Sequence, residues 1–264
     1  IGMGGLGNVV MTVPALAAAG KTKYAIIRAD VPGTAALRGL LQPAVEAYGA
    51  EIVADIPSTI GTSDFSQFVL AAQNAGADGA LMAVGRDEAI QILRAAQQLD
   101  SDVFFSISLG SLGRSDVIEF GDYASQFVFN GAFPPATVDP EPFPILAVAL
   151  RELAATDEPH LQPDSLTAAA LQSWVYLYAF IEMARESQLA EFTPASVTEM
   201  LNAATDVDMG GLTPPWTPNR ESPGVFSRVS QPHYWLASWD GDEENFVLDP
   251  KQVDAEKVLA GEKQ

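Results

Sequence analysis

Cysteine is absent from the 264 residues of this chain, which excludes disulfide bonds, zinc–thiolate sites and thiol nucleophiles. Histidine is scarce, because only His160 and His233 occur, far apart and without carboxylates at ligand spacing, so we expect no metal site. No apolar run approaches the roughly 18 residues that a membrane-spanning helix needs. Residues 1–7 lack the basic region and the cleavage pattern of a signal peptide, so we expect any such leader to lie outside this chain.

Basic residues are also few: 14 Lys and Arg stand against 34 Asp and Glu, which gives a formal net charge of −20. A chain of this charge repels a phosphate backbone or an anionic membrane surface, so nucleic-acid binding is not expected. The apolar fraction of 48% is enough to form one large core or two modest ones. We expect two lobes.

Catalytic signatures are missing as well. The sequence has no Gly-x-Ser-x-Gly or phosphate-loop pattern, and Ser111, which lies between Gly110 and Gly113, lacks the required spacing. No nucleophile–base pair and no paired carboxylates stand out. We therefore predict that the protein is not an enzyme and uses no cofactor.

One stretch favours a different interpretation, because the start of the chain matches the letters of a dinucleotide-binding fingerprint at Gly2, Gly4 and Gly7. Asp30, at the end of the next predicted strand, would then bind a ribose hydroxyl of the nucleotide. Against this, only Ile1 remains of the strand that should precede the fingerprint, and Pro14 interrupts the phosphate-binding helix. The other interpretation is a flexible entry loop followed by a short helix at 8–19.

Strand-like and helix-like patterns alternate from residue 23 to residue 111. Short apolar runs predict strands at 23–28, 51–57, 79–83 and 103–107. Apolar residues at helical spacing predict helices at 35–48, 63–76 and 86–99 between them. Strands joined by helices run parallel, so the sequence predicts an α/β fold with a doubly wound parallel sheet, extended by a helix at 114–120 and a fifth strand at 126–132.

In such a sheet, ligands bind outside the carboxyl ends of the strands, where the strand order reverses. If the order is 2-1-3-4, the reversal lies between the first and third strands. We therefore expect the ligand-binding loops at 30–33, 84–87 and 108–113.

The second half of the chain has a different pattern. A proline-rich segment after residue 133 precedes predicted helices at 143–155, 165–187 and 194–204, and the middle helix has an apolar face too wide to be left in water. Strand patterns return at 225–229, 233–239 and 246–248, the last two joined by the hairpin signal Asp240-Gly241. We expect four parts: an entry loop and helix at 1–21, an α/β ligand-binding lobe at 22–133 and 224–250, helices of another lobe at 134–223, and a fraying polar tail at 251–264.

Several stretches, in this order, resemble one protein family. They are Lys-Tyr-Ala-Ile-Ile-Arg-Ala-Asp-Val-Pro-Gly at 23–33, Asp64-Phe65 before Gly76-Ala77-Asp78, Gln91 to Ala96, Ala-Leu-Gln-Ser at 170–173, Met-Gly-Gly-Leu-Thr at 209–213 and Trp-Asp-Gly at 239–241. The chain resembles the type I solute-binding proteins of bacterial ABC importers, in particular the leucine/isoleucine/valine-binding group. The resemblance implies a monomeric, periplasmic or extracellular Venus-flytrap that delivers a small solute to a membrane permease. It also implies that the opening βα units of the first lobe would precede Ile1.

The resemblance also indicates which positions contact the solute. Amino-acid-binding members have a tyrosine, an aromatic residue and an ammonium-binding carboxylate at positions that fall near Pro32, at Gly85 or Arg86, and at Leu109. None is kept here, so we expect an aromatic or branched organic acid rather than a standard α-amino acid. The predicted ligand-binding residues are Asp30, Val31, Pro32, Gly85, Arg86, Ser108 and Leu109.

Other interpretations of these residues stay open. Arg86 could bind a carboxylate, or be solvated or paired with Asp87, and Asp30 is as well suited to accept backbone N–H groups in a turn. Ser106 and Ser108 could hydrogen-bond a carbonyl or hydroxyl group. The alternatives for function are a receptor's ligand-sensing domain and a nucleotide-dependent enzyme that uses the glycine loop.

Overall fold

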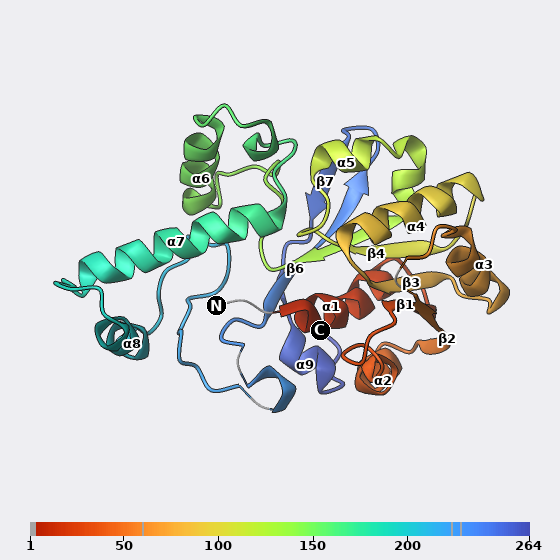
Figure 1. Cartoon of the computed structure of the whole chain (residues 1–264), viewed down its shortest axis with the longest axis horizontal. Helices are drawn as coiled ribbons and strands as arrows, with labels where there is room; N and C mark the ends of the chain where they lie inside the picture. Colours follow the sequence, from red (N-terminus) through yellow and green to blue (C-terminus); the bar gives the residue numbers. More distant parts are fainter. Residues whose placement is uncertain (1–3, 60, 223, 228) are drawn as a thin grey trace.

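The computed structural model describes residues 4–59, 61–222, 224–227 and 229–264, and its centre is one mixed β-sheet (Figure 1). The eight strands are β1 Lys23–Ala29, β2 Glu51–Ser58, β3 Gly79–Ala83, β4 Phe104–Ser108, β5 Phe127–Gly131, β6 His233–Asp240, β7 Asn245–Leu248 and β8 Val253–Asp254. Their order is β2-β1-β3-β4-β5-β6-β7, with β8 paired to β6. Strands β1 to β5 run parallel, and β6 and β7 are antiparallel.

Helices cover both faces of this sheet. They are α1 Gly4–Ala18, α2 Leu37–Ala47, α3 Ser66–Asn74, α4 Arg86–Gln98, α5 Arg114–Ile118 and α9 Ala255–Leu259. The buried side chains of α1, α2 and α9 form one core with Tyr24 and Ile26 of β1. The buried side chains of α3, α4 and α5 form the other core with Ile27 and Phe105. Because successive strand residues point to opposite faces, one strand serves both cores. The predicted doubly wound α/β fold is confirmed, and the strand order is the 2-1-3-4 assumed in placing the ligand-binding loops.

Helix α1 differs from the sequence-based expectation. It begins at Gly4, within the expected loop, and continues through Pro14 to Ala18. Buried Val10, Met11, Val13 and Leu16 hold it against the sheet, and this packing offsets the hydrogen bond that a proline removes. Gly4 and Gly7 are therefore helical rather than part of a phosphate-binding loop, which disfavours the alternative nucleotide-binding interpretation, and the expected entry loop is helical from Gly4 onward; Gly2 lies outside the described residues.

Two other predictions are wrong. The strand expected at 225–229 is replaced by a 3-10 turn at Gly224–Phe226, where Gly224 has a φ of +57°; residue 228 lies outside the described residues. The tail expected to fray instead forms β8 and α9. Three of its apolar residues, Val253, Ala255 and Val258, are buried, and the Asp254 side chain accepts backbone hydrogen bonds from Glu256 and Lys257 at the start of α9.

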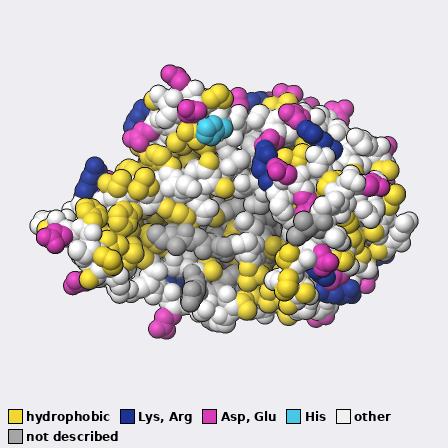
Figure 2. Space-filling model, in the orientation of Figure 1, with side chains coloured by type: hydrophobic (Ala, Val, Ile, Leu, Met, Phe, Trp, Pro, Cys, Tyr) yellow, Lys and Arg dark blue, Asp and Glu magenta, His cyan; other side chains and the backbone are white. Residues whose placement is uncertain are grey.

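The remaining helices are α6 Pro144–Ala154, α7 Ala168–Glu186 and α8 Pro194–Ala203, with short 3-10 turns at Gly121–Gln126 and Pro159–Leu161. In Figure 1, α6, α7 and α8 lie to the left of the sheet and its covering helices. Figure 2 shows hydrophobic side chains gathered on that side. Leu177, Ile181 and Phe192 are 59%, 39% and 68% exposed. The assignment of these helices to another lobe stays a prediction.

Candidate functional site

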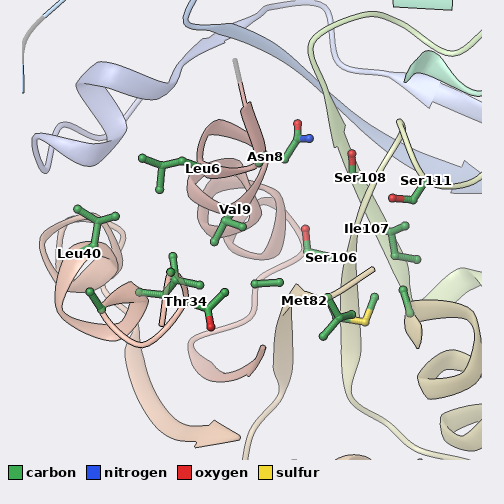
Figure 3. A pocket seen from close by; sticks show the side chains of 17 residues that line it. Leu6, Asn8, Val9, Thr34, Leu40, Met82, Ser106, Ile107, Ser108 and Ser111 are labelled. Carbon is green, nitrogen blue, oxygen red and sulfur yellow. The ribbon is translucent and has the colours of Figure 1, made fainter. Parts of the chain in front are cut away.

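A cavity of about 550 Å³ opens at the carboxyl ends of β1, β3 and β4. This is the place where the strand order reverses, since β1 lies between β2 and β3. Its volume is in the range of small-molecule sites. The residues that line it are Gly5, Leu6, Asn8, Val9, Gly33, Thr34, Ala36, Leu37, Leu40, Met82, Ala83, Val84, Ala89, Ser106, Ile107, Ser108 and Ser111. In Figure 3, Leu6, Asn8 and Val9 of α1 lie between Leu40 on one side and Ser106 and Ser108 on the other.

The lining is mostly apolar, with a few hydroxyl and amide groups. None of the described residues that line it carries a charge. Thr34 is already used by the loop after β1, because its hydroxyl donates to the carbonyls of Ala29 and Val31. Ser106 is 1% exposed, and its Oγ accepts a 3.4 Å hydrogen bond from Asn130 Nδ2. The cavity is suited to an apolar solute that has a small number of uncharged hydrogen-bonding partners.

Of the ligand-binding residues predicted from the sequence, Ser108 lines this cavity. The other six do not. Asp30 has a side chain that is 58% exposed, with Oδ1 4.0 Å from Arg28 Nη1. Val31 and Pro32 are exposed on the same loop, while their neighbours Gly33 and Thr34 face the cavity. Gly85 is exposed and precedes the first residue of α4.

Arg86 borders the cavity without lining it. Its Nε donates a 2.8 Å hydrogen bond to the carbonyl of Ser111, a cavity residue. Its Nη2 lies 2.8 Å from Asp116 Oδ1, and its Nη1 lies 3.7 Å from Asp87 Oδ1. The guanidinium therefore links the start of α4 to the loop after β4. Of the interpretations open from the sequence, pairing with a carboxylate describes Arg86 best, with Asp116 as the nearer partner and Asp87 as the farther one.

Leu109 is placed differently from the expectation that its side chain faces a solute. It is 1% exposed and belongs to the core formed with α3, α4 and α5. Its backbone N–H donates to Asn130, and its carbonyl accepts from Ala168. Since strand side chains alternate, Ser106 and Ser108 point to the face of the sheet that α1 covers. Leu109 follows Ser108 directly, so its side chain points to the opposite face, which α3, α4 and α5 cover. Leu109 therefore contributes packing in this structure.

Sequence reasoning missed the contribution of α1 to the cavity. It placed a helix at 8–19 but did not place that helix over the strand ends, where Leu6, Asn8 and Val9 lie. A signal was available, since residues 9–19 are apolar apart from Thr12. A helix that is apolar all round is buried, so this segment had to cover the sheet.

The histidines stay apart from the cavity. His160 is exposed, and His233 begins β6, where burial lowers its pKa and the nearby Asp254 carboxylate opposes that effect. Within the described ranges, no three His, Asp or Glu side chains are grouped so that they could hold a metal ion. Over the same ranges, no helix combines the length and apolarity required to cross a membrane.

A family model described as periplasmic binding protein matches residues 7–243. No curated protein matches the chain.

Solved structures match over nearly the whole chain. A branched chain amino acid ABC transporter protein from Thermus thermophilus, with bound valine, is 16% identical with a TM-score of 0.69, and the match covers 96% of this chain and 66% of that one. A fatty acid ABC transporter substrate-binding protein from Thermomonospora curvata is 15% identical, with a TM-score of 0.71 and coverages of 96% and 64%. An ABC transporter substrate binding protein from Aeropyrum pernix is 14% identical, with a TM-score of 0.70 and coverages of 97% and 68%. This chain thus spans about two thirds of the length of these proteins, and identities this low show a shared fold.

Proposed function

The chain belongs to the periplasmic binding protein family, and from this we propose that it binds a small solute outside the cytoplasmic membrane and delivers it to the permease of an ABC importer. The observation that carries the proposal is the cavity at the carboxyl ends of β1, β3 and β4, where a doubly wound sheet binds its ligand. Binding of this kind makes and breaks no covalent bond. The solute acts by stabilising the conformation that contacts it best.

The lining of the cavity favours a solute with an apolar body. Leu6, Val9, Leu40, Met82 and Ile107 supply apolar surface from four separate elements. Neither an ammonium nor a carboxylate would find a counter-charge among the described lining residues, and an unpaired buried charge costs several kcal/mol. A positive charge lies at the rim, because Arg86 donates to the carbonyl of the lining residue Ser111. We therefore propose a branched or aromatic organic acid, or a related carbonyl compound, in preference to a standard α-amino acid. The named relatives, one with bound valine and one described as a fatty acid transporter protein, are compatible with an apolar body.

A thermal-shift screen tests the proposal. The probes are 4-methylpentanoate, 3-phenylpropanoate, their amides, leucine and NAD. A ligand at a hundredfold excess over its dissociation constant adds about 2.7 kcal/mol of stability, so an acid or amide that binds raises the melting temperature. NAD is expected to leave it unchanged.

Two tryptophan variants locate the binding. Val84→Trp fills the cavity and is expected to abolish the shift. Val247→Trp adds the same bulk on β7, at a residue that is 49% exposed, and is expected to keep the shift. A shift that survives Val84→Trp, or a shift with NAD alone, would contradict the proposed function.

A further inference from the structure

A smaller cavity of about 160 Å³ adjoins the main one. Asn8 and Ser108 line both cavities. The remaining residues that line the smaller one are Gly110, Gly131, Ala132, Phe133, Ala168, Ala169, Gln172 and Tyr234. We call this space the polar chamber. It lies between the ends of β4 and β5, the start of α7 and the hydroxyl end of Tyr234 on β6.

Tyr234 lines the polar chamber and carries a buried hydroxyl group that makes no hydrogen bond to the described residues. The residue is 0% exposed. A buried polar group without a partner is costly, so this arrangement needs a reason. Position 7 makes room for the group, because a Cβ added to Gly7 would lie 1.8 Å from the Tyr234 hydroxyl oxygen. An acceptor oxygen that enters the chamber would supply the partner that no described residue supplies.

The chamber is better suited to an acceptor than to a donor. Burial, and secondarily Tyr176, raises the pKa of Tyr234, so its hydroxyl keeps its proton at neutral pH and can donate. The first turn of α7 faces the chamber through Ala168, Ala169 and Gln172. A helix N-terminus carries a partial positive charge, which favours negative or acceptor groups, although the N–H groups of Ala168 and Ala170 already donate to the Leu109 carbonyl and the Thr167 hydroxyl.

No carboxylate opposes this preference. The described residues that line the chamber are all uncharged, as are those of the main cavity. An ammonium group placed there would face the start of α7 without a counter-charge. A carboxylate or carbonyl oxygen would gain a hydrogen bond from a hydroxyl that otherwise has none.

We propose that the polar chamber binds the carboxylate or carbonyl oxygen of the solute, with Tyr234 as the donor, while the apolar body of the solute lies in the main cavity. This inference rests on the proposed function, since it assigns the two ends of the same ligand. It makes Tyr234 a residue that selects acids and carbonyl compounds against amines.

Calorimetric titration with three probes of one carbon skeleton tests this assignment. The probes are 4-methylpentanoate, 4-methylpentanamide and 4-methylpentylamine, used with the wild-type protein and with Tyr234→Phe. The acid and the amide are expected to bind to the wild type, and the amine at least tenfold more weakly. Tyr234→Phe is expected to weaken the acid roughly tenfold, because a hydrogen bond to a charged group is lost.

Tyr24→Phe is the matched control. Tyr24 is also fully buried on the face covered by α1, but its hydroxyl donates a 3.0 Å hydrogen bond to the Lys21 carbonyl. This variant is expected to leave acid binding unchanged. A merely structural role for Tyr234 would instead lower the melting temperature of Tyr234→Phe at least as much as that of Tyr24→Phe, with no effect on binding.

The outcomes separate the two proposals. Equal acid binding by the wild type and Tyr234→Phe, or amine binding as tight as acid binding, overturns the role of the chamber and leaves the proposed function standing. Binding of none of the three probes, together with no thermal shift from 3-phenylpropanoate or its amide, overturns both. Selective loss of acid and amide binding in Tyr234→Phe supports the assignment.

Discussion

The helices of the α/β part and the helices that follow residue 143 differ in how completely their apolar faces are covered. Helix α4 buries its apolar stripe, including Ile92 and Leu93, which are both 0% exposed. Helix α7 buries one side but leaves Leu177 and Ile181 in solvent, and Phe192 beyond its end is 68% exposed. An apolar stripe is buried only where another surface faces it. The sheet supplies that surface to α4, and no described segment supplies it to this side of α7.

The largest expected effect separates the two regions by stability. Phe105→Ala removes a ring that is 0% exposed beneath α4, so we expect the free energy of unfolding to fall by about 3–5 kcal/mol. Phe192→Ala removes an identical ring from an exposed position, and we expect a change within about 0.5 kcal/mol. Urea unfolding followed by tryptophan fluorescence measures both. Similar losses for the two variants would break the comparison, because they would show that Phe192 is covered in solution.

The next effect tests how closely α1 approaches the sheet. Gly7→Ala places a methyl group against the Tyr234 hydroxyl, and we expect overpacking to cost about 1–3 kcal/mol. Gly5→Ala is the control, since a Cβ there meets nothing within 4 Å, and helix propensity favours alanine by up to about 1 kcal/mol. Thermal unfolding of the two variants should therefore move in opposite directions. A stabilised Gly7→Ala variant would mean that α1 lies farther from β6 than the structure shows.

A binding effect of intermediate size is expected at α4. Arg86 holds the Ser111 carbonyl at the cavity rim, and Arg94 lies on the same helix with Nη2 3.2 Å from Glu119 Oε2 at the surface. We expect Arg86→Ala to weaken 4-methylpentanoate roughly tenfold, about 1.4 kcal/mol, and Arg94→Ala to leave binding unchanged. Calorimetric titration measures the dissociation constant of 4-methylpentanoate for each variant. Equal affinities of Arg86→Ala and the wild type would show that the hydrogen bond from Arg86 to Ser111 does not contribute to solute binding.

The smallest expected effect is a change in how stability depends on pH, and it involves His233, which lies beside Asp254 near the end of the chain. Burial lowers the pKa of His233 in the folded state below its ordinary value of 6.5. The unfolded chain therefore binds the proton more readily, so this histidine reduces stability as the pH falls below about 6.5 towards the folded pKa. His233→Gln should flatten that part of the stability profile. An unchanged slope between pH 7 and 5 would show that His233 is solvated in the folded protein.

The alternation of strands and helices could be predicted because it depends on residue patterns that repeat over short distances, whereas the strand order 2-1-3-4 was an assumption that the structure bears out. Apolar runs such as 79–83, separated by amphipathic helices, specify parallel strands, and the reversal between β1 and β3 follows from the order. The loops predicted at that edge contribute Gly33, Val84, Ser108 and Ser111 to the cavity. Local pattern was sufficient for this part of the fold.

The individual contacts could not be predicted in the same way. Ser108 and Leu109 differ by one position, and in this structure that step moves a side chain from the cavity to the core. A one-residue change of register reverses the face of every side chain in a strand, and the sequence leaves the end of β4 uncertain by that much. The structure of the tail, which was expected to fray, also could not be predicted from local sequence. Its apolar residues, such as Val253 and Val258, are too few to give a periodic signal, yet they meet a surface made by α1 and α2.

The most direct test is a structure of the protein with 4-methylpentanoate. The account predicts the branched chain between α1 and the ends of β3 and β4, with a carboxylate oxygen within hydrogen-bond distance of the Tyr234 hydroxyl. Binding of the acid among α6, α7 and α8, or with its carboxylate turned away from Tyr234 towards Arg86, would contradict it.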